Sequence, residues 1–330
     1  MSELHRFLFD GLPVRGALVR LTGSWVEILR RRASNSNTGA YAPGVRNLLG
    51  EMAAAATLMQ SNIKFDGSLV LQVFGDGAVK VAVVEVQPDF AFRATATVVG
   101  EIAADATLSQ MVNASNQGRC AITLDPKTKF PGQQPYQGVV PLCDAQGEPL
   151  ETLGAMLEHY MQQSEQLDTT LVLAANDALA AGLLIQRVPM QGSANLGGSV
   201  APERDEERLR ALDEDYHRIA LLARSLQREE LLTLDAPTIL RRLFWEEKLI
   251  GFEPAQGSTA PRFACNCSRE RVGKMIHQLG VAEVDGILAE RGEVEVACEF
   301  CGVQYRFDAV DAAQLFATDS VPLPGGTARH

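Results

Sequence analysis

Long apolar runs are absent from this sequence of 330 residues. No stretch reaches the roughly 20 apolar residues that a membrane-spanning helix needs. The first residues, Met1 to Arg6, also lack the basic stretch and the apolar segment of a secretory signal. We therefore expect a cytoplasmic protein without a membrane partner, in a compartment where thiols stay reduced.

Positive charge is scarce, since 30 Lys and Arg residues stand against 41 Asp and Glu residues and the formal net charge is −11 at pH 7. Non-specific binding to nucleic acids depends on Lys and Arg side chains that neutralise phosphates. The composition therefore argues against nucleic acid as a main partner. Hydrophobic residues make up 46% of the chain, which is typical of a globular protein with a buried core and excludes disorder of the whole chain.

Common catalytic motifs are also missing. The sequence contains no G-x-x-x-x-G-K-[ST], no H-E-x-x-H and no G-x-S-x-G. Its five histidines are scattered and never paired at metal-ligand spacing; they are His5, His159, His217, His277 and His330. We therefore predict that the protein is not an enzyme.

Residues 1–190 have the pattern of an α+β core. Residues 45–62 are apolar or small nearly all round, which predicts a helix buried on several sides. Further helix patterns cover residues 24–32 and 150–166, and a polar loop is expected at 31–44. Strand patterns occur at 14–21, 68–75, 78–86, 90–99, 119–124, 138–142, 169–174 and 181–188. A buried helix between antiparallel β-sheets favours α+β over a doubly wound sheet.

Two boundaries divide the rest of the chain. Residues 191–202 are rich in Gly and Ser, and residues 256–261 form a second turn-rich stretch. Between them we predict a helical connector, residues 203–255, with one helix over 203–230 and another over 237–249. The first helix carries an apolar stripe that we expect to pack on a neighbour: Leu209, Leu212, Tyr216, Ile219, Leu222, Ala223 and Leu226. Residues 262–318 are predicted to form a small C-terminal zinc domain.

Four of the six cysteines fall in two close pairs within that last domain. Cys265 and Cys267 form C-x-C, and after 30 residues Cys298 and Cys301 form C-x-x-C. Two pairs of thiolates are the ligands that a tetrahedral site for a soft metal requires. The spacing matches neither common ferredoxin pattern, so it favours one Zn²⁺ per chain over an iron–sulfur cluster. Four cysteines leave no open coordination position, so this zinc is not predicted to be catalytic.

The spacing alone leaves two roles open for the zinc. One is structural, in which the metal folds a domain that is too small to fold unaided. The other is regulatory: the thiolates react with oxidants, form Cys265–Cys267 and Cys298–Cys301 disulfides, and expel the metal.

Cys120 and Cys143 have no metal spacing and are predicted to be buried, inert thiols. His277 lies between the pairs but is expected to occupy a solvated helix position, because four cysteines complete the coordination shell.

The cysteine quartet, with Ser-Arg-Glu-Arg at residues 268–271, resembles the redox switch of the heat-shock protein 33 family of bacterial chaperones. The resemblance extends over nearly the whole chain and includes several ordered blocks. These are Pro13-Val14-Arg15-Gly16, Asn47-Leu48-Leu49-Gly50-Glu51, Lys64-Phe65-Asp66-Gly67-Ser68, Gly75-Asp76-Gly77, Tyr136-Gln137-Gly138-Val139-Val140, Ser164-Glu165-Gln166-Leu167, Glu229-Glu230-Leu231-Leu232-Thr233-Leu234 and Ile287-Leu288-Ala289-Glu290. The sequence departs from the family pattern at residues 31–44, 191–202 and 319–330, none of which contains a metal ligand.

This resemblance implies a redox-regulated holdase chaperone that works without ATP. The reduced, zinc-bound form is expected to be inactive. Oxidation would form the two local disulfides, release zinc, and unfold the zinc domain together with the connector, which exposes a surface for clients. The implied partners are unfolded or oxidatively damaged client proteins, and the oxidised form is expected to be a homodimer.

Two other functions fit the sequence less well. A zinc ribbon that binds nucleic acid, with a purely structural zinc, would need a basic patch, whereas acidic residues outnumber basic ones over residues 262–316. A thiol–disulfide oxidoreductase would need C-x-x-C at a helix N-terminus with an attacking thiol that is free of metal. Cys301 is instead followed by a strand pattern at residues 303–307.

Overall fold

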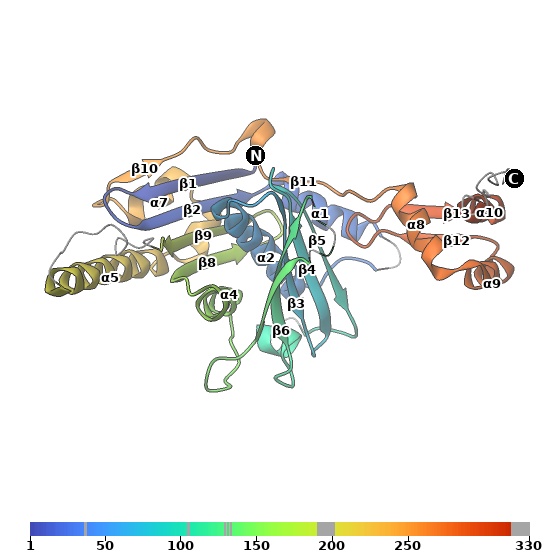
Figure 1. The fold of residues 1–330 in the computed structure, drawn as a ribbon, viewed down its shortest axis with the longest axis horizontal. Helices are drawn as coiled ribbons and strands as arrows, with labels where there is room; N and C mark the ends of the chain where they lie inside the picture. The colour runs from blue at the N-terminus through green and yellow to red at the C-terminus, as the bar shows by residue number, and fades with distance from the viewer. Residues whose placement is uncertain are drawn as a thin grey trace, which may run out of the picture. The chain divides into compact units, whose positions relative to one another are not determined.

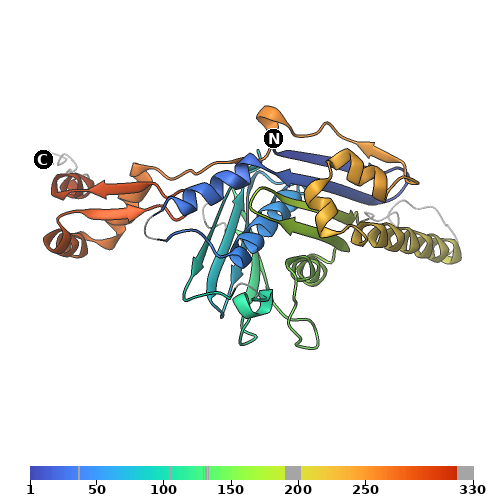
Figure 2. The ribbon, with the colours of Figure 1, turned by 180° about the vertical axis from the view of Figure 1, so that it is seen from behind.

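The computed structural model describes residues 1–35, 38–103, 106–128, 130, 132, 134–189 and 202–317, with side chains omitted for residues 202–209. Contacts between residues divide the chain into two compact units, Met1–Ala264 and Cys265–His330. They are called unit 1 and unit 2, and Figures 1 and 2 show their elements from opposite sides. Within the described residues, no helix combines the length and the apolar character needed to cross a membrane.

Unit 1 contains two β-sheets. Sheet A has the strand order β10 (Leu249–Gly251), β1 (Glu3–Phe9), β2 (Val14–Leu21), β9 (Ala180–Arg187), β8 (Thr169–Ala175). Sheet B has the order β11 (Arg262–Phe263), β5 (Ala91–Val98), β4 (Val79–Val86), β3 (Gly67–Phe74), β6 (Arg119–Pro126), β7 (Tyr136–Pro141). Neighbouring strands are antiparallel except β11, which runs parallel to β5.

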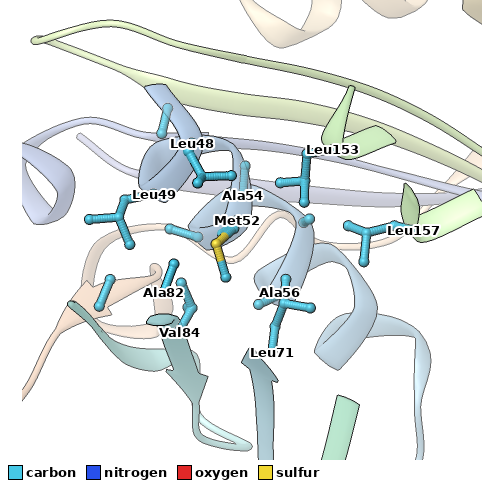
Figure 3. Close-up of a cluster of buried hydrophobic side chains, with 14 of the residues drawn as sticks. Leu48, Leu49, Met52, Ala54, Ala56, Leu71, Ala82, Val84, Leu153 and Leu157 are labelled. Atoms are coloured by element: carbon cyan, nitrogen blue, oxygen red, sulfur yellow. The ribbon is translucent and has the colours of Figure 1, made fainter. Parts of the chain in front are cut away.

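Helix α2 (Pro43–Asn62) lies between the two sheets (Figures 1 and 2). Its alanines 53–56 are fully buried. Figure 3 shows its apolar side chains together with Leu71 and Val84 of sheet B and Leu157 of α4 (Leu153–Tyr160). A Cβ added at Gly50 would lie 2.4 Å from the Cβ of Ala175, so the small residues let the helix approach sheet A closely. The predicted α+β class, with a buried helix between β-sheets, is confirmed.

The remaining helices of the core are short. They are α1 (Gly23–Ala33), α3 (Leu108–Val112) and α4, which continues into a π-helical turn, η1 (Met161–Glu165). The helix predicted over residues 150–166 is therefore α-helical in its middle only, and Gln166 ends it with a φ of 55°. The loop predicted at 31–44 is shorter than expected, because α1 continues to Ala33 and α2 begins at Pro43.

Three connector helices cover the face of sheet A that points away from α2: α5 (Pro202–Arg224), α6 (Arg228–Thr233) and α7 (Ala236–Leu243). In the predicted stripe, Tyr216, Ile219, Ala223 and Leu226 are buried in this second hydrophobic cluster, whereas Leu212 and Leu222 are half-buried. The Leu209 side chain lies outside the described residues. An ion pair also joins α6 to α2, since Arg228 Nη1 donates to Glu51 Oε1 at 3.3 Å.

Some predicted elements are wrong in detail. The helix predicted over 203–230 breaks at residues 225–227, and the helix predicted over 237–249 ends at Leu243. Phe244 then packs edge-on against Phe9, with ring centroids 5.1 Å apart, and the chain forms β10 instead. Strand β1 was not predicted from the sequence. The boundary at 191–202 lies almost wholly outside the described residues, where α5 begins at Pro202, and the tail at 319–330 lies entirely outside them.

Unit 2 consists of helices around a two-stranded hairpin. Its elements are α8 (Arg269–Leu279), α9 (Val281–Arg291), β12 (Val294–Ala297), β13 (Gln304–Phe307) and α10 (Ala309–Ala317). A short 3₁₀ turn, η3 (Gly257–Thr259), lies before it in unit 1. The buried cluster of unit 2 is small and consists of Ile276, Val284, Val294, Phe307 and Ala312.

Candidate metal centre

The fold of unit 2 brings the four clustered cysteines together. The Sγ atoms of Cys265, Cys267, Cys298 and Cys301 all lie within 4.8 Å of one another. Close contacts join the two pairs, because Cys265 Sγ is 3.7 Å from Cys298 Sγ and Cys267 Sγ is 3.3 Å from Cys301 Sγ. The four thiols can therefore hold one metal ion.

Local backbone structure places each pair. Cys298 and Cys301 lie in the loop between β12 and β13, where the amide of Cys298 donates to the carbonyl of Val303 at 2.9 Å. The amide of Gly302 donates back to the carbonyl of Cys298 at 2.8 Å, and its φ of 72° suits glycine in this tight turn. Both cysteines therefore lie on one hairpin loop.

The C-x-C pair precedes a capped helix. Ser268 is the N-cap of α8, and its side chain accepts a hydrogen bond from the amide of Arg271 at 3.2 Å. Arg271 also donates through Nη1 to the carbonyl of Asn266, between the two cysteines, at 3.0 Å. These bonds fix the backbone of the first pair relative to α8.

The arrangement fits a tetrahedral zinc site. Zn²⁺ binds cysteine sulfur at about 2.3 Å, so ideal geometry separates the sulfurs by roughly 3.8 Å. The distances of 3.7 Å and 3.3 Å between the pairs are close to that value. Four soft thiolates with no open position also suit a closed site rather than a catalytic one.

The thiols differ in their electrostatic surroundings when no metal is bound. Burial acts to raise the pKa of Cys267, but hydrogen bonds from the Tyr305 hydroxyl, at 3.2 Å, and from neighbouring thiols lower this pKa to about 7. Burial raises the pKa of Cys298 and, more strongly, that of Cys301. Cys267 is therefore the thiol that ionises most readily among these three.

Tyr305 was not among the site residues predicted from the sequence. This residue lies on β13, four positions after Cys301, so the strand pattern after the second pair was the signal that could have placed it near the thiols. Its hydroxyl reaches Cys267 because β12 and β13 pair in register, with Val296 opposite Tyr305.

Cys120, Cys143 and His277 are not members of the four-thiol cluster. Cys120 lies on β6 and is fully buried, as predicted, and burial raises its pKa to about 12. Cys143 is only half-buried, beyond the end of β7, so the prediction that it is buried is wrong. His277 is on α8, where its ring stacks on Phe316 with centroids 5.0 Å apart.

Comparison with known proteins covers nearly the full length of the chain. A family model described as "Hsp33 protein" matches residues 2–308. The protein named "33 kDa chaperonin" from Chromobacterium violaceum is 44% identical over 329 residues, which covers 100% of this chain and 98% of that protein. Its namesake from Methylobacillus flagellatus is 40% identical and covers 100% of this chain and 99% of its own.

A solved structure agrees with the fold. The crystal structure of the 33 kDa chaperonin (heat shock protein 33 homolog) from Thermotoga maritima matches with a TM-score of 0.72. At 21% sequence identity it covers 96% of this chain and 99% of its own, and this likeness supports the fold alone. The resemblance carried by the cysteine quartet and the ordered sequence blocks is confirmed by the family model and by the relatives. The chain belongs to the Hsp33 family.

Proposed function

We propose that this protein is a redox-regulated, ATP-independent holdase chaperone, active in the cytoplasm under oxidative stress. Family membership and the names of its relatives support a chaperone, and they give no reason to expect an enzyme. The observation that carries the redox part is the convergence of four thiols within 4.8 Å in a unit whose own buried core is small.

In the reduced form, Cys265, Cys267, Cys298 and Cys301 are the residues that would hold Zn²⁺. The metal, when bound, supplies positive charge that keeps these sulfurs deprotonated and adds folding free energy to unit 2. Tyr305 supports the site because its hydroxyl donates to Cys267 Sγ. Such outer hydrogen bonds orient a ligand and hold its charge.

Oxidation is proposed to occur within each pair. In each pair two thiolates lose two electrons to a peroxide, one S–S bond forms, and the peroxide O–O bond breaks to give two water molecules after two protons are taken up. The products are the Cys265–Cys267 and Cys298–Cys301 disulfides. One or two intervening residues give each thiol a high effective concentration near its own partner. A disulfide sulfur is no longer an anionic ligand, so the four residues would no longer hold the metal.

Loss of the metal is proposed to unfold the zinc domain, residues 262–318, and then the connector, residues 203–255, while the core of residues 1–190 persists. The connector covers a large apolar surface on sheet A, including Tyr216, Ile219 and Leu226. Release of these helices would expose their apolar stripe and the sheet face beneath it. Unfolded clients would bind this surface, and the oxidised chain would form a homodimer through the same kind of contact.

The proposal is tested by measuring zinc content and client aggregation in parallel. Reduced protein should contain one zinc per chain and leave a heat-denatured client free to aggregate. Peroxide with mild heating should release the zinc and suppress light scattering by the client. Cys120→Ser/Cys143→Ser should behave as wild type, whereas Cys265→Ser/Cys267→Ser should lose zinc without oxidant. Loss of zinc from the first double variant would overturn the ligand assignment.

Disulfide mapping tests the proposed pairing. Peptide mass spectrometry of partly oxidised protein should detect Cys298–Cys301 before Cys265–Cys267, because a C-x-C ring is tighter and more strained. A dominant Cys267–Cys298 link, or a C-x-C bond that appears first, would contradict the proposed order.

A further inference from the structure

A pocket lies within unit 1 at the C-terminal end of α2, far along the sequence from the cysteines. Side chains from both sheets line it, together with residues from α2 and the π-helical turn η1. Water-sized spheres can occupy about 90 Å³ of the pocket, within an empty space of about 530 Å³ that includes the part open to solvent. Apolar side chains make up most of its wall, among them Ile63, Leu69, Ile122, Leu124 and Leu184.

One end of the pocket carries a guanidinium group with spare donors. Arg15 donates through Nη1 to the carbonyl of Asn62, at 2.7 Å, and through Nε and Nη2 to Oε1 of Gln186. These three bonds leave two of its five N–H groups unused. Among the residues that the structure describes, no carboxylate forms an ion pair with Arg15. Asn62 Nδ2 is also buried there and lacks a hydrogen-bond partner within the described ranges.

A second polar group lines the same pocket. Tyr160 is 1% exposed, and its buried hydroxyl makes no hydrogen bond of normal geometry to the part of the chain that is described, although Ser164 lies nearby. Gly138 of β7 leaves space for it, since a Cβ at that position would lie 2.0 Å from the hydroxyl oxygen. Glu165 is also on the pocket wall and accepts a hydrogen bond from Tyr136 at 2.9 Å.

Buried donors without acceptors cost free energy, and this pocket contains two of them, Asn62 Nδ2 and the Tyr160 hydroxyl, beside the unused N–H groups of the half-buried Arg15. The pocket is therefore suited to a ligand that supplies oxygen atoms. The adjoining π-helical turn is a feature that is frequent at functional sites. We propose that this pocket binds a small amphipathic acid with a hydroxyl group at the end opposite its carboxylate. The carboxylate accepts from Arg15 and Asn62, and the apolar body fills the space between the sheets.

The hydroxyl end of the ligand is placed by Tyr160 and Glu165. The ligand hydroxyl accepts a hydrogen bond from Tyr160 and donates one to the Glu165 carboxylate. The opposite charges of Arg15 and Glu165 also set the orientation of the ligand, because Glu165 repels an anionic group and Arg15 repels a cationic one. The site therefore discriminates between the two ends of the ligand by charge.

Three probes with a common phenylethyl skeleton test the charge and hydroxyl requirements on the reduced, zinc-loaded full chain. They are 3-(4-hydroxyphenyl)propionate, 3-phenylpropionate, which lacks the hydroxyl, and tyramine, which replaces the carboxylate with an ammonium group. Titrations followed by NMR or calorimetry should give saturable binding of the hydroxy acid. We expect 3-phenylpropionate to bind about fivefold to tenfold more weakly and tyramine at least tenfold more weakly. Absence of saturable binding of the hydroxy acid at 10 mM, or equal binding of tyramine, would overturn the proposal.

Tyr160→Phe separates a ligand-binding role from a structural one. The variant removes an unsatisfied buried hydroxyl, so we expect its Tm to equal or exceed that of wild type. Its affinity for the hydroxy acid should fall to that for 3-phenylpropionate, and its affinity for 3-phenylpropionate should not change. Ile63→Phe, which narrows the pocket, should weaken both acids. Equal losses for both acids in Tyr160→Phe would show that the hydroxyl does not contact the ligand and would contradict the assigned orientation.

Discussion

Cys267 accepts a hydrogen bond from the Tyr305 hydroxyl, and this contact distinguishes it from the deeper Cys301. A phenol that donates to sulfur stabilises the thiolate and fixes the direction of its lone pairs. The same bond raises the pKa of Tyr305 to about 12, because a phenolate beside this sulfur would be unfavourable. Tyr305 is therefore a positioning residue for the proposed metal ligand.

Replacing Tyr305 with Phe should weaken zinc binding without abolishing it. Loss of a hydrogen bond to a ligand typically costs 10–100-fold in metal affinity, and we expect about tenfold here. Competition with a chromophoric chelator measures the change. Tyr136→Phe, which removes a tyrosine hydroxyl in unit 1, is the matched control and should retain wild-type affinity. Unchanged zinc affinity in Tyr305→Phe would mean that the hydrogen bond does not support the site.

Glu51 connects the buried helix to the connector, because it pairs with Arg228 of α6. Only about a fifth of its side chain is exposed (20%). Burial raises its pKa to about 7, and the attraction of Arg228 offsets this increase only in part. The folded state therefore binds a proton at Glu51 that the unfolded chain releases near its ordinary pKa of about 4.5.

This raised pKa predicts a stability change with a defined sign. The pKa of Glu51 is higher in the folded state than in the unfolded state. Proton binding at Glu51 therefore stabilises the folded state fully below about pH 4.5, and this stabilisation is lost as the pH rises to about 7. Glu51→Gln should remove this loss, and its unfolding free energy at pH 7.5 should exceed that of wild type by about 1–3 kcal/mol. Urea unfolding of both proteins at pH 5 and pH 7.5 measures this difference in unfolding free energy. Glu148→Gln, on an exposed loop, should show the wild-type pH dependence; the same dependence in Glu51→Gln would contradict the assignment.

The connector helices form an element whose two faces differ sharply. On α5, Ile219 is fully buried against sheet A, whereas Leu221 is 68% exposed two residues later. Burial of the first side chain holds the helix on the sheet, and the second contributes little to that packing. This difference provides a matched pair of substitutions on one helix.

Ile219→Glu should release the connector from sheet A under reducing conditions. A charge at this buried position costs about 3 kcal/mol or more, so the variant should suppress client aggregation without oxidant and become sensitive to protease along α5. The half-buried Leu222→Glu should act in the same direction but less strongly, and Leu221→Glu should resemble wild type. If Ile219→Glu destabilises the connector but gains no holding activity, the stripe is not the regulated surface.

Element prediction succeeded where the local pattern and the tertiary fold agree. Helix α2 was predictable because small and apolar residues occupy nearly all of its faces, and such a helix is not stable in an exposed position. Strand β1 was not predictable, because the polar residues Glu3, His5 and Arg6 interrupt its apolar pattern. It forms a strand through its pairing with β2. Residues 244–249 were wrongly assigned to a helix because Phe244 is held by Phe7 and Phe9, which sequence periodicity does not reveal.

The four ligands of the candidate metal centre were predictable from the sequence, but the residue that supports them was not. Cysteine spacing is itself the constraint on a four-thiol site, so the ligand set could be proposed before the fold was known. Tyr305 could not be placed, because its contact depends on the register of β12 against β13. The pocket near Arg15 was also hidden, since its wall is assembled from segments far apart in the chain.

The two units differ in how much apolar core each can use for its own stability. Unit 1 has two large buried clusters around α2 and sheet A, whereas the buried cluster of unit 2 has five members among the described residues 265–317. A small core rarely supplies enough free energy on its own, and a bound metal commonly supplies the rest. Unit 2 is therefore the part of the molecule whose stability we expect to depend on the proposed zinc ion.

Removal of zinc by a chelator should unfold unit 2 and leave the core of unit 1 folded. Structural zinc contributes on the order of 10 kcal/mol to such domains, which exceeds what the cluster around Ile276 and Phe307 can replace. Hydrogen exchange should show loss of protection in α8, α9 and β12, with protection retained in α2 and β3. Restored zinc should restore protection under reducing conditions. Retained protection in unit 2 without metal would show that its own core is sufficient.

One stretch of chain, residues 249–263, supplies the outermost strand at one side of both sheets: β10 beside β1 and β11 beside β5. If this stretch detached, β1 and β5 would become open edges with unpaired backbone N–H and C=O groups. Such edges accept any extended polypeptide as an added strand, largely without regard to its sequence. A single detachment would therefore create two backbone templates for unfolded chains, in addition to any apolar surface that it uncovers.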